Sequence, residues 1–127
     1  GELARVLLAL KTVLAQAEEI PTIVFDEVDA GLGGRTAVKL GEKLRSLGEL
    51  RQVLCVTHLP VVASFGTHHY SVQKSTRQSR TIVQASLLGP EERVVELTRM
   101  LGGSADEQVT SEHARELLRR TSGELGS

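Results

Sequence analysis

The sequence predicts an α/β fold, in which helices flank a small parallel sheet and an antiparallel hairpin lies at one side. A short apolar run rich in β-branched residues at 21–25 and a second predicted strand at 51–57 are separated by a segment with helical spacing of its apolar residues. A strand–helix–strand succession of this kind favours parallel pairing of the two strands. Such strands are expected to be buried on both faces. Residues 69–74 and 81–87 predict the hairpin, with residues 75–80 as its tip.

Helices are predicted before, between and after these strands. Apolar residues at helical spacing predict a helix from Glu2 that fades at residues 18–19, and a second helix after Gly33 and Gly34 that stops at Gly48. A short helix is expected at 60–65. Three further segments follow from the later part of the sequence: a helix from Pro90 to about residue 101, a helix over about 106–120, and a frayed tail at 121–127.

The bulk composition limits the classes of function. The chain has 127 residues, enough for one domain, and its net charge of −1 gives no global attraction to DNA or to a membrane. One cysteine fits a reducing compartment, and no apolar window approaches the ~20 residues of a membrane span, so the sequence predicts a cytoplasmic protein. The basic cluster Lys74, Arg77 and Arg80 is expected to be a solvated hairpin tip, with DNA contact as the alternative.

Carboxylates follow the first predicted strand directly, at Asp26, Glu27 and Asp29. Ligands of open α/β sheets lie beyond the carboxyl ends of the strands. Hydrolysis of ATP requires a cation that bridges phosphate oxygens and a positioned water. Because successive strand side chains point to opposite faces, we expect Asp26 to hold Mg²⁺ and Glu27 to orient the water. The alternative is a polar strand end that caps neighbouring amides.

A histidine, His58, follows the second predicted strand. In a parallel sheet it would stand beside Glu27, where a neutral imidazole can contact the γ-phosphate and hold the geometry of the water. A lone histidine is otherwise more often structural. The position at the tip of the strand favours the functional interpretation.

These residues carry a family resemblance. Residues 23–27 resemble a Walker B segment of the ATP-binding-cassette (ABC) class, 28–32 its D-loop, and 56–58 its switch-histidine loop. Residues 1–5 resemble the end of the Ser-Gly-Gly-Glu signature motif. Over longer segments, residues 25–37, 56–60 and 91–101, the sequence is similar to the RecN family, bacterial SMC-like ATPases of double-strand-break repair.

The resemblance implies that residues 1–127 are the C-terminal lobe of an ABC/SMC-type P-loop NTPase head. Its partners would be the N-terminal Walker A lobe of the same protein, a second head in a homodimer, and DNA through the full-length protein, at the bacterial nucleoid. ATP and Mg²⁺ would be its cofactors, and ATP binding would dimerise the heads. Asp26, Glu27 and His58 would act on the nucleotide of their own head.

Further residues are implied to act across the two heads. Gly1 and Glu2 would face the nucleotide of the other head, and Asp29 would lie at the seam between them. The chain also departs from the pattern: no Gly-x-x-x-x-Gly-Lys-Ser/Thr occurs, and the glycine-rich segment 31–36 lacks the lysine. Together with a first residue that is not Met, this predicts a fragment that alone binds ATP weakly and does not hydrolyse it.

Other functions stay open at this point. One is the head of a different ABC ATPase such as a transporter subunit, although transporters more often carry Gln at the position of Glu2. Another is a Toprim-like metal-dependent phosphoryl-transfer domain with Asp26 and Asp29 on Mg²⁺. The third is a non-catalytic dimerisation or DNA-docking lobe.

Overall fold

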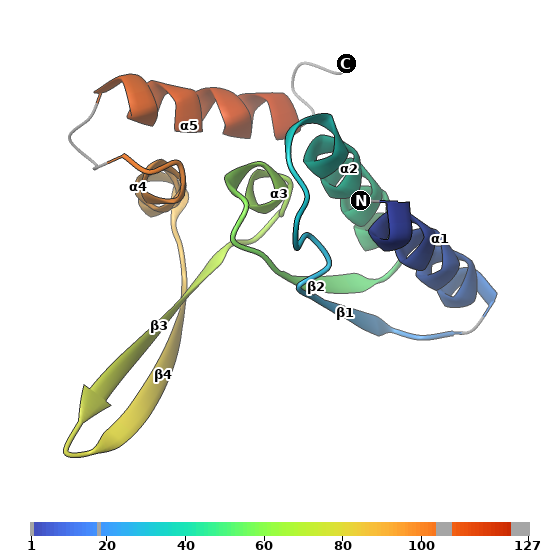
Figure 1. Ribbon diagram of the computed structural model, residues 1–127, viewed down its shortest axis with the longest axis horizontal. Helices are drawn as coiled ribbons and strands as arrows, with labels where there is room; N and C mark the ends of the chain where they lie inside the picture. Colours follow the sequence, from blue (N-terminus) through green and yellow to red (C-terminus); the bar gives the residue numbers. More distant parts are fainter. Residues whose placement is uncertain (1, 18, 104–107, 123–127) are drawn as a thin grey trace. The chain divides into compact units, whose positions relative to one another are not determined.

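The computed structural model describes residues 2–17, 19–103 and 108–122 and confirms the α/β class (Figure 1). It divides into two compact units, residues 1–65 and 66–127, and each is described by itself. The first unit contains α1 (Glu2–Ala17), β1 (Thr22–Asp26), α2 (Gly34–Leu50), β2 (Gln52–Val56) and α3 (Pro60–Ser64). The second contains β3 (Tyr70–Arg77), β4 (Arg80–Leu87), α4 (Pro90–Met100) and α5 (Gln108–Thr121).

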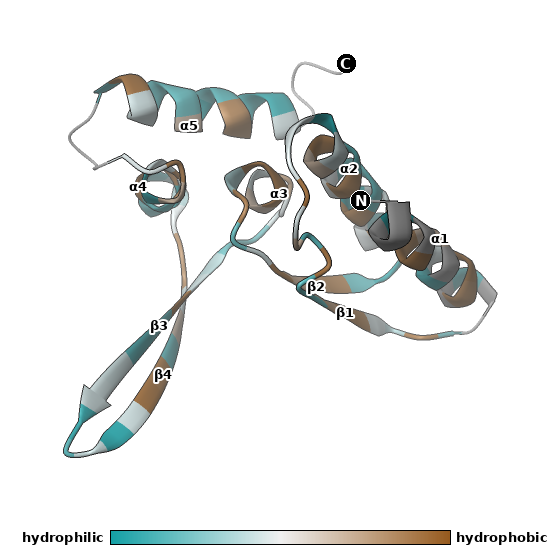
Figure 2. Ribbon diagram, viewed as in Figure 1, coloured by the Kyte–Doolittle hydropathy of each residue, from teal (hydrophilic) through white to brown (hydrophobic). Residues whose placement is uncertain are grey.

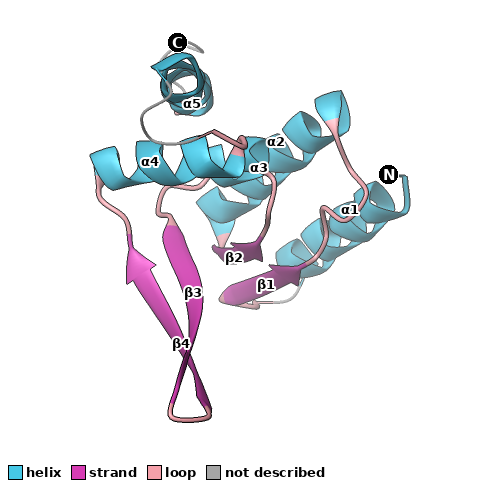
Figure 3. Ribbon diagram, turned by 60° about the vertical axis from the view of Figure 1, so that its left-hand side comes forward, coloured by secondary structure: helices cyan, strands magenta, loops and turns pink. Residues whose placement is uncertain are grey.

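The sheet of the first unit is the predicted parallel pair, β1 beside β2 (Figure 3). Its register runs from Thr22 opposite Gln52 to Asp26 opposite Val56. The helix α2 connects the two strands, since a parallel pair needs a long crossover between them. Both strands therefore end at the same edge of the sheet.

One face of this sheet carries the core of the first unit. The side chain of Phe25 is only 1% exposed, and Lys11 of α1 places its Nζ 4.8 Å from the centroid of the Phe25 ring. Burial of one such apolar side chain stabilises a fold by about 1.5–3 kcal/mol. The buried cluster is made of Leu8, Phe25, Leu32, Ala37, Leu40, Leu44, Leu47 and Val62.

The opposite face of the sheet is exposed, so the prediction that the strands are buried on both faces is wrong for this chain. Val24, Leu54 and Val56 are 55%, 48% and 59% exposed, and Figure 2 shows hydrophobic colouring along both strands. The physical reason is that the core of this unit forms on the side of Phe25, and alternate side chains of a strand point away from it.

Two glycines of α2 have opposite surroundings. The predicted stop at Gly48 is wrong, because the helix continues to Leu50, and the Arg51 N–H then donates to Leu47 O at 3.0 Å as the chain turns into extended backbone. Gly41 lies against α3: a Cβ at this position would sit 2.1 Å from Cδ2 of Phe65. The absence of a side chain at Gly41 lets α2 and α3 approach this closely.

In the second unit, β3 and β4 form the predicted antiparallel hairpin, but its tip is shorter than expected. The register runs from Tyr70 opposite Leu87 to Arg77 opposite Arg80, which leaves only Gln78 and Ser79 in the turn. Both have positive φ values, 50° and 63°. A two-residue turn of this kind matches the twist of the paired strands, so the strands extend through most of the predicted six-residue tip.

The helices α4 and α5 contact one another. As predicted, α4 begins at Pro90, and the Gly89 N–H donates to Glu92 Oε1 at 3.1 Å. An ion pair joins Arg115 Nη2 of α5 to Glu91 Oε2 of α4 at 3.1 Å. Thr121 is buried in the last turn of α5, so a frayed tail does not begin there; residues 123–127 lie outside the described part of the chain.

Candidate functional site

The predicted site residues gather at one edge of the parallel pair. Asp26 is the last residue of β1 and lies opposite Val56, the last residue of β2. Glu27 follows the first strand directly, and His58 comes two residues after the second. The side chains of Asp26, Glu27 and His58 are all exposed. The fold thus brings two carboxylates and an imidazole to the carboxyl ends of neighbouring strands.

The backbone changes direction at Glu27. Its φ of 56° lies in the left-handed region, so strand alternation, on which the separate orientations of Asp26 and Glu27 were predicted, ends at Asp26. A non-glycine residue held there costs on the order of 1–3 kcal/mol, and such residues concentrate at functional sites. Ala30 N–H donates to Glu27 O at 3.2 Å, and the buried Leu32 then anchors the turn in the core.

Asp29 lies inside the protein. It is 1% exposed, and the Thr57 hydroxyl donates a hydrogen bond to its Oδ2. The same hydroxyl oxygen accepts the Leu59 N–H at 3.0 Å. The turn after β1 is therefore tied to the segment after β2. A role for Asp29 at a seam with a second head stays a prediction; its observed partner belongs to its own chain.

The cysteine behind the site is not a nucleophile at neutral pH. Cys55 packs against the core, and this burial, together with the negative charges of Asp29 and Asp26, raises the pKa of its thiol to about 11. A thiol with this pKa remains protonated, and only the thiolate reacts readily. Cys55 is therefore a packed side chain and not a reactive thiol at neutral pH.

Two of the residues predicted to act across the heads, Gly1 and Glu2, fall at the start of the chain. Gly1 lies outside the described residues. Glu2 is the first residue of α1, but its side chain also lies outside the described part. Their roles stay predictions.

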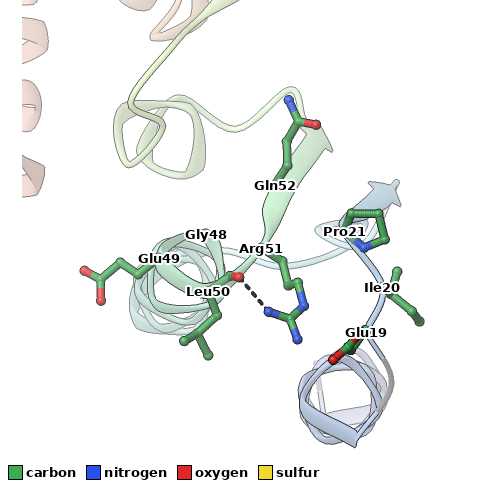
Figure 4. A pocket seen from close by; sticks show the side chains of 8 residues that line it. All are labelled: Glu19, Ile20, Pro21, Gly48, Glu49, Leu50, Arg51 and Gln52. Atoms are coloured by element: carbon green, nitrogen blue, oxygen red, sulfur yellow. Dashed lines mark hydrogen bonds between the residues drawn. The ribbon is translucent and has the colours of Figure 1, made fainter.

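A shallow cavity of about 570 Å³ lies at the other end of the sheet, where β1 and β2 begin (Figure 4). Within it, Arg51 Nη1 donates to Leu50 O at 2.8 Å. None of the predicted site residues lines this cavity. Its lining residues are Glu19, Ile20, Pro21, Gly48, Glu49, Leu50, Arg51 and Gln52.

The described residues contain no group of three or more His, Cys, Asp and Glu side chains placed to hold a metal ion. A Mg²⁺ ion that accompanies a nucleotide needs no such cage, because one or two carboxylates, water and phosphate oxygens complete its shell. None of the helices in the described ranges is long and apolar enough to cross a membrane.

Sequence reasoning missed Thr57. The signal was present, since a hydroxyl residue directly precedes His58. Its importance depends on the buried Asp29, which lies 28 positions earlier in the chain. Nothing in the sequence pattern alone pairs these two residues.

Comparison with solved structures bears on the fold. The chain superposes with a TM-score of 0.64 on a chain from structural work on ATP-driven dimerization and DNA-stimulated activation of SMC ATPases. The match covers 80% of this chain and 60% of that chain, at 20% identity. The likeness shows that this chain shares the fold of that chain, in agreement with the predicted α/β fold.

Sequence comparison confirms the resemblance to RecN. The chain is 48% identical to the DNA repair protein RecN of Vibrio cholerae serotype O1 and 49% identical to that of Deinococcus radiodurans, over 93% of its length in both cases. It is 52% identical to RecN of Xylella fastidiosa over 81% of its length. The chain spans about a fifth of the length of these relatives, 18–21%. No protein-family model matches it.

Proposed function

We propose that this chain is the C-terminal part of the ATP-binding and ATP-hydrolysing head of a RecN-like protein of DNA double-strand-break repair. The observation that carries the proposal is the placement of Asp26, Glu27 and His58 at the carboxyl ends of two neighbouring parallel strands. The likeness to RecN proteins and to an SMC ATPase structure supports it.

In this proposal each of the three side chains has its own task. Asp26 fits Mg²⁺ because it is an exposed carboxylate at the sheet edge where a ligand would sit. The metal, when bound with ATP, neutralises charge on the phosphate oxygens. Glu27 accepts a hydrogen bond from the attacking water and orients it. His58 donates a ring N–H to the γ-phosphate and holds the water in line.

The rest of the head would complete the fold. The exposed apolar side chains Val24, Leu54 and Val56 offer a surface for the N-terminal Walker A lobe of the same protein. Covering them would give the two-sided burial that the apolar strands favour. The sequence holds no Walker A motif, so the chain alone would bind ATP weakly and not hydrolyse it.

At the level of the whole protein, ATP would be bound between two heads, with Gly1 and Glu2 facing the nucleotide of the partner head. ATP binding would bring the heads of a homodimer together and hydrolysis would release them. DNA would be engaged through the full-length protein, in the bacterial cytoplasm at the nucleoid.

The test is Glu27→Gln in the full-length protein. The substitution keeps the size of the side chain and removes the base, so we expect the steady-state ATPase rate to fall by about 10²–10⁴-fold, with ATP affinity within about threefold of wild type. Glu49→Gln, the same change on the exposed end of α2, is the matched control and should leave the rate unchanged. An unchanged rate in Glu27→Gln would instead favour a non-catalytic dimerisation or DNA-docking lobe.

The structure weakens the Toprim-like alternative. That chemistry would place Asp26 and Asp29 together on one Mg²⁺, whereas Asp29 is buried against Thr57 and Asp26 is exposed. It would also want an acid at the end of an earlier strand, and the element that precedes β1 is the helix α1. The likeness to RecN proteins likewise favours a repair ATPase over a transporter subunit.

A further inference from the structure

The loop that carries His58 is fixed on both sides of the histidine. Before it, the Thr57 hydroxyl donates to the buried carboxylate of Asp29. After it, the Leu59 N–H donates to the oxygen of the same hydroxyl at 3.0 Å. A threonine hydroxyl has one proton to donate and lone pairs to accept with, and this arrangement uses both. Thr57 therefore closes a small loop around His58.

Both ends of this arrangement are anchored in the first unit. Asp29 belongs to the turn that starts at Glu27. The Leu32 N–H donates to Asp29 O at 3.0 Å, and the side chain of Leu32 is part of the core. Leu59 packs against the same core and directly precedes α3; the Ala63 N–H donates to Leu59 O at 3.0 Å. The position of the histidine backbone is thus set by residues that are themselves held by packing.

The side chain of His58 differs from its neighbours in this loop. It is exposed, whereas Asp29 is buried and Thr57 and Leu59 are partly buried. The backbone of His58 is thus fixed by a hydrogen bond between distant parts of the chain, while its side chain stays accessible to a ligand. Preorganisation of this kind matters for catalysis because a misplacement of about 1 Å can cost ~10²-fold in rate.

We infer that Thr57 is a positioning residue for His58, with the buried Asp29 as its hydrogen-bond acceptor within the same chain. The inference rests on the proposed function, in which His58 contacts the γ-phosphate. Asp29 then has a role inside its own head, because its hydrogen bond with Thr57 joins the turn after β1 to the histidine loop. Glu27 and His58 then keep a fixed relative placement, since Glu27 begins the turn that contains Asp29.

The experiment is a double-mutant cycle in the full-length protein, with Thr57→Val and His58→Ala. Valine keeps the shape of threonine and removes the hydroxyl. Thr57→Val should lower kcat for ATP hydrolysis by about tenfold or more and leave KM within about twofold, because the nucleotide still binds. In the His58→Ala background, measured by single turnover, the same substitution should cost less than about twofold, because its effect is transmitted through His58.

Conservative and matched variants separate positioning from damage to the fold. Thr57→Ser retains the hydroxyl and should restore at least half of the wild-type kcat. Thr22→Val is the matched control: its hydroxyl donates to Gln52 Oε1 at 3.0 Å at the opposite end of the same two strands, and kcat should not change. If Thr57→Val does not fold, Asp29→Asn, which keeps an acceptor oxygen but weakens it, should lower kcat about threefold, and this loss should vanish beside His58→Ala.

The outcomes distinguish the inference from the function on which it rests. A loss from Thr57→Val that is equally large in the His58→Ala background, or no loss at all, overturns the positioning role while Glu27→Gln and His58→Ala still impair hydrolysis. If Glu27→Gln and His58→Ala hydrolyse ATP at the wild-type rate, the proposed function itself fails. A Thr57→Ser variant as slow as Thr57→Val also overturns the inference, because the hydroxyl would then not be the group that matters.

Discussion

Substitution of Gly41 by alanine should destabilise the first unit, although alanine is the better helix former. The added Cβ would lie 2.1 Å from Cδ2 and 2.5 Å from Cε2 of Phe65, whereas carbon atoms pack best at about 3.5–4.0 Å. The ring must therefore move, or α2 and α3 must separate. Overpacking of this kind costs about 1–3 kcal/mol, and the helix propensity of alanine offsets about 1 kcal/mol. At the upper end of the range, which so short an approach favours, the net loss is about 2 kcal/mol.

The same helix supplies the control. A Cβ on Gly48 would meet nothing within 4 Å, so Gly48→Ala should stabilise by about 0.5–1 kcal/mol. Urea denaturation and thermal melting of the 127-residue chain, followed by circular dichroism, measure both variants. We expect the midpoints to move in opposite directions. A third variant, Gly41→Ala with Phe65→Leu, should recover about 1 kcal/mol or more, because the shorter side chain vacates the space. If Gly41→Ala is as stable as Gly48→Ala, the close approach of α2 and α3 is wrong.

Two further predictions concern chemistry at Cys55 and strain in the hairpin. With its pKa at about 11 instead of 9.0, the Cys55 thiol should react with iodoacetamide at pH 8 roughly a hundredfold more slowly than a free thiol. Between these two pH values the Cys55 thiol has lost its proton in the unfolded chain and retains it in the folded chain. The free energy of unfolding should therefore fall as pH rises from 9.0 to about 11, and it should fall less steeply in Cys55→Ser. In the hairpin, replacing Gln78 by Asn and Ser79 by Gly should raise the urea midpoint by the equivalent of about 1 kcal/mol, because both positions have positive φ. A lower midpoint would contradict that turn geometry.

The order of the elements was predictable because it depends on local patterns. Three features depend only on residues that are close in sequence: short apolar runs, helical spacing, and Pro90 at the start of a helix. The parallel pairing of β1 and β2 followed from the helix between them. The burial of the strands was not predictable in the same way. Val24 and Leu54 are apolar yet about half exposed in this chain, and an apolar pattern alone does not say which segment of a protein covers it.

The candidate site shows the same division. Asp26, Glu27 and His58 could be placed together because their positions follow from strand ends. The burial of Asp29 could not, since an aspartate before a glycine-rich turn is usually solvated and its partner Thr57 comes from a different loop. The left-handed backbone of Glu27 had no signal either, because glutamate has no particular preference for that region. These long-range and strained features are the ones that pattern reasoning misses.

The strained backbone at Glu27 is explained by what surrounds it. A left-handed glutamate persists only where neighbouring contacts over-determine the turn. Here Phe25 is buried two residues before it, and Asp29 is buried two residues after it on the Thr57 hydroxyl. The chain between these two buried side chains has little freedom, so the Glu27 carboxylate is directed outward by packing on both sides. With its backbone fixed, Glu27 presents its exposed carboxylate from a constant point at the edge of the sheet, as its proposed role in orienting the attacking water requires.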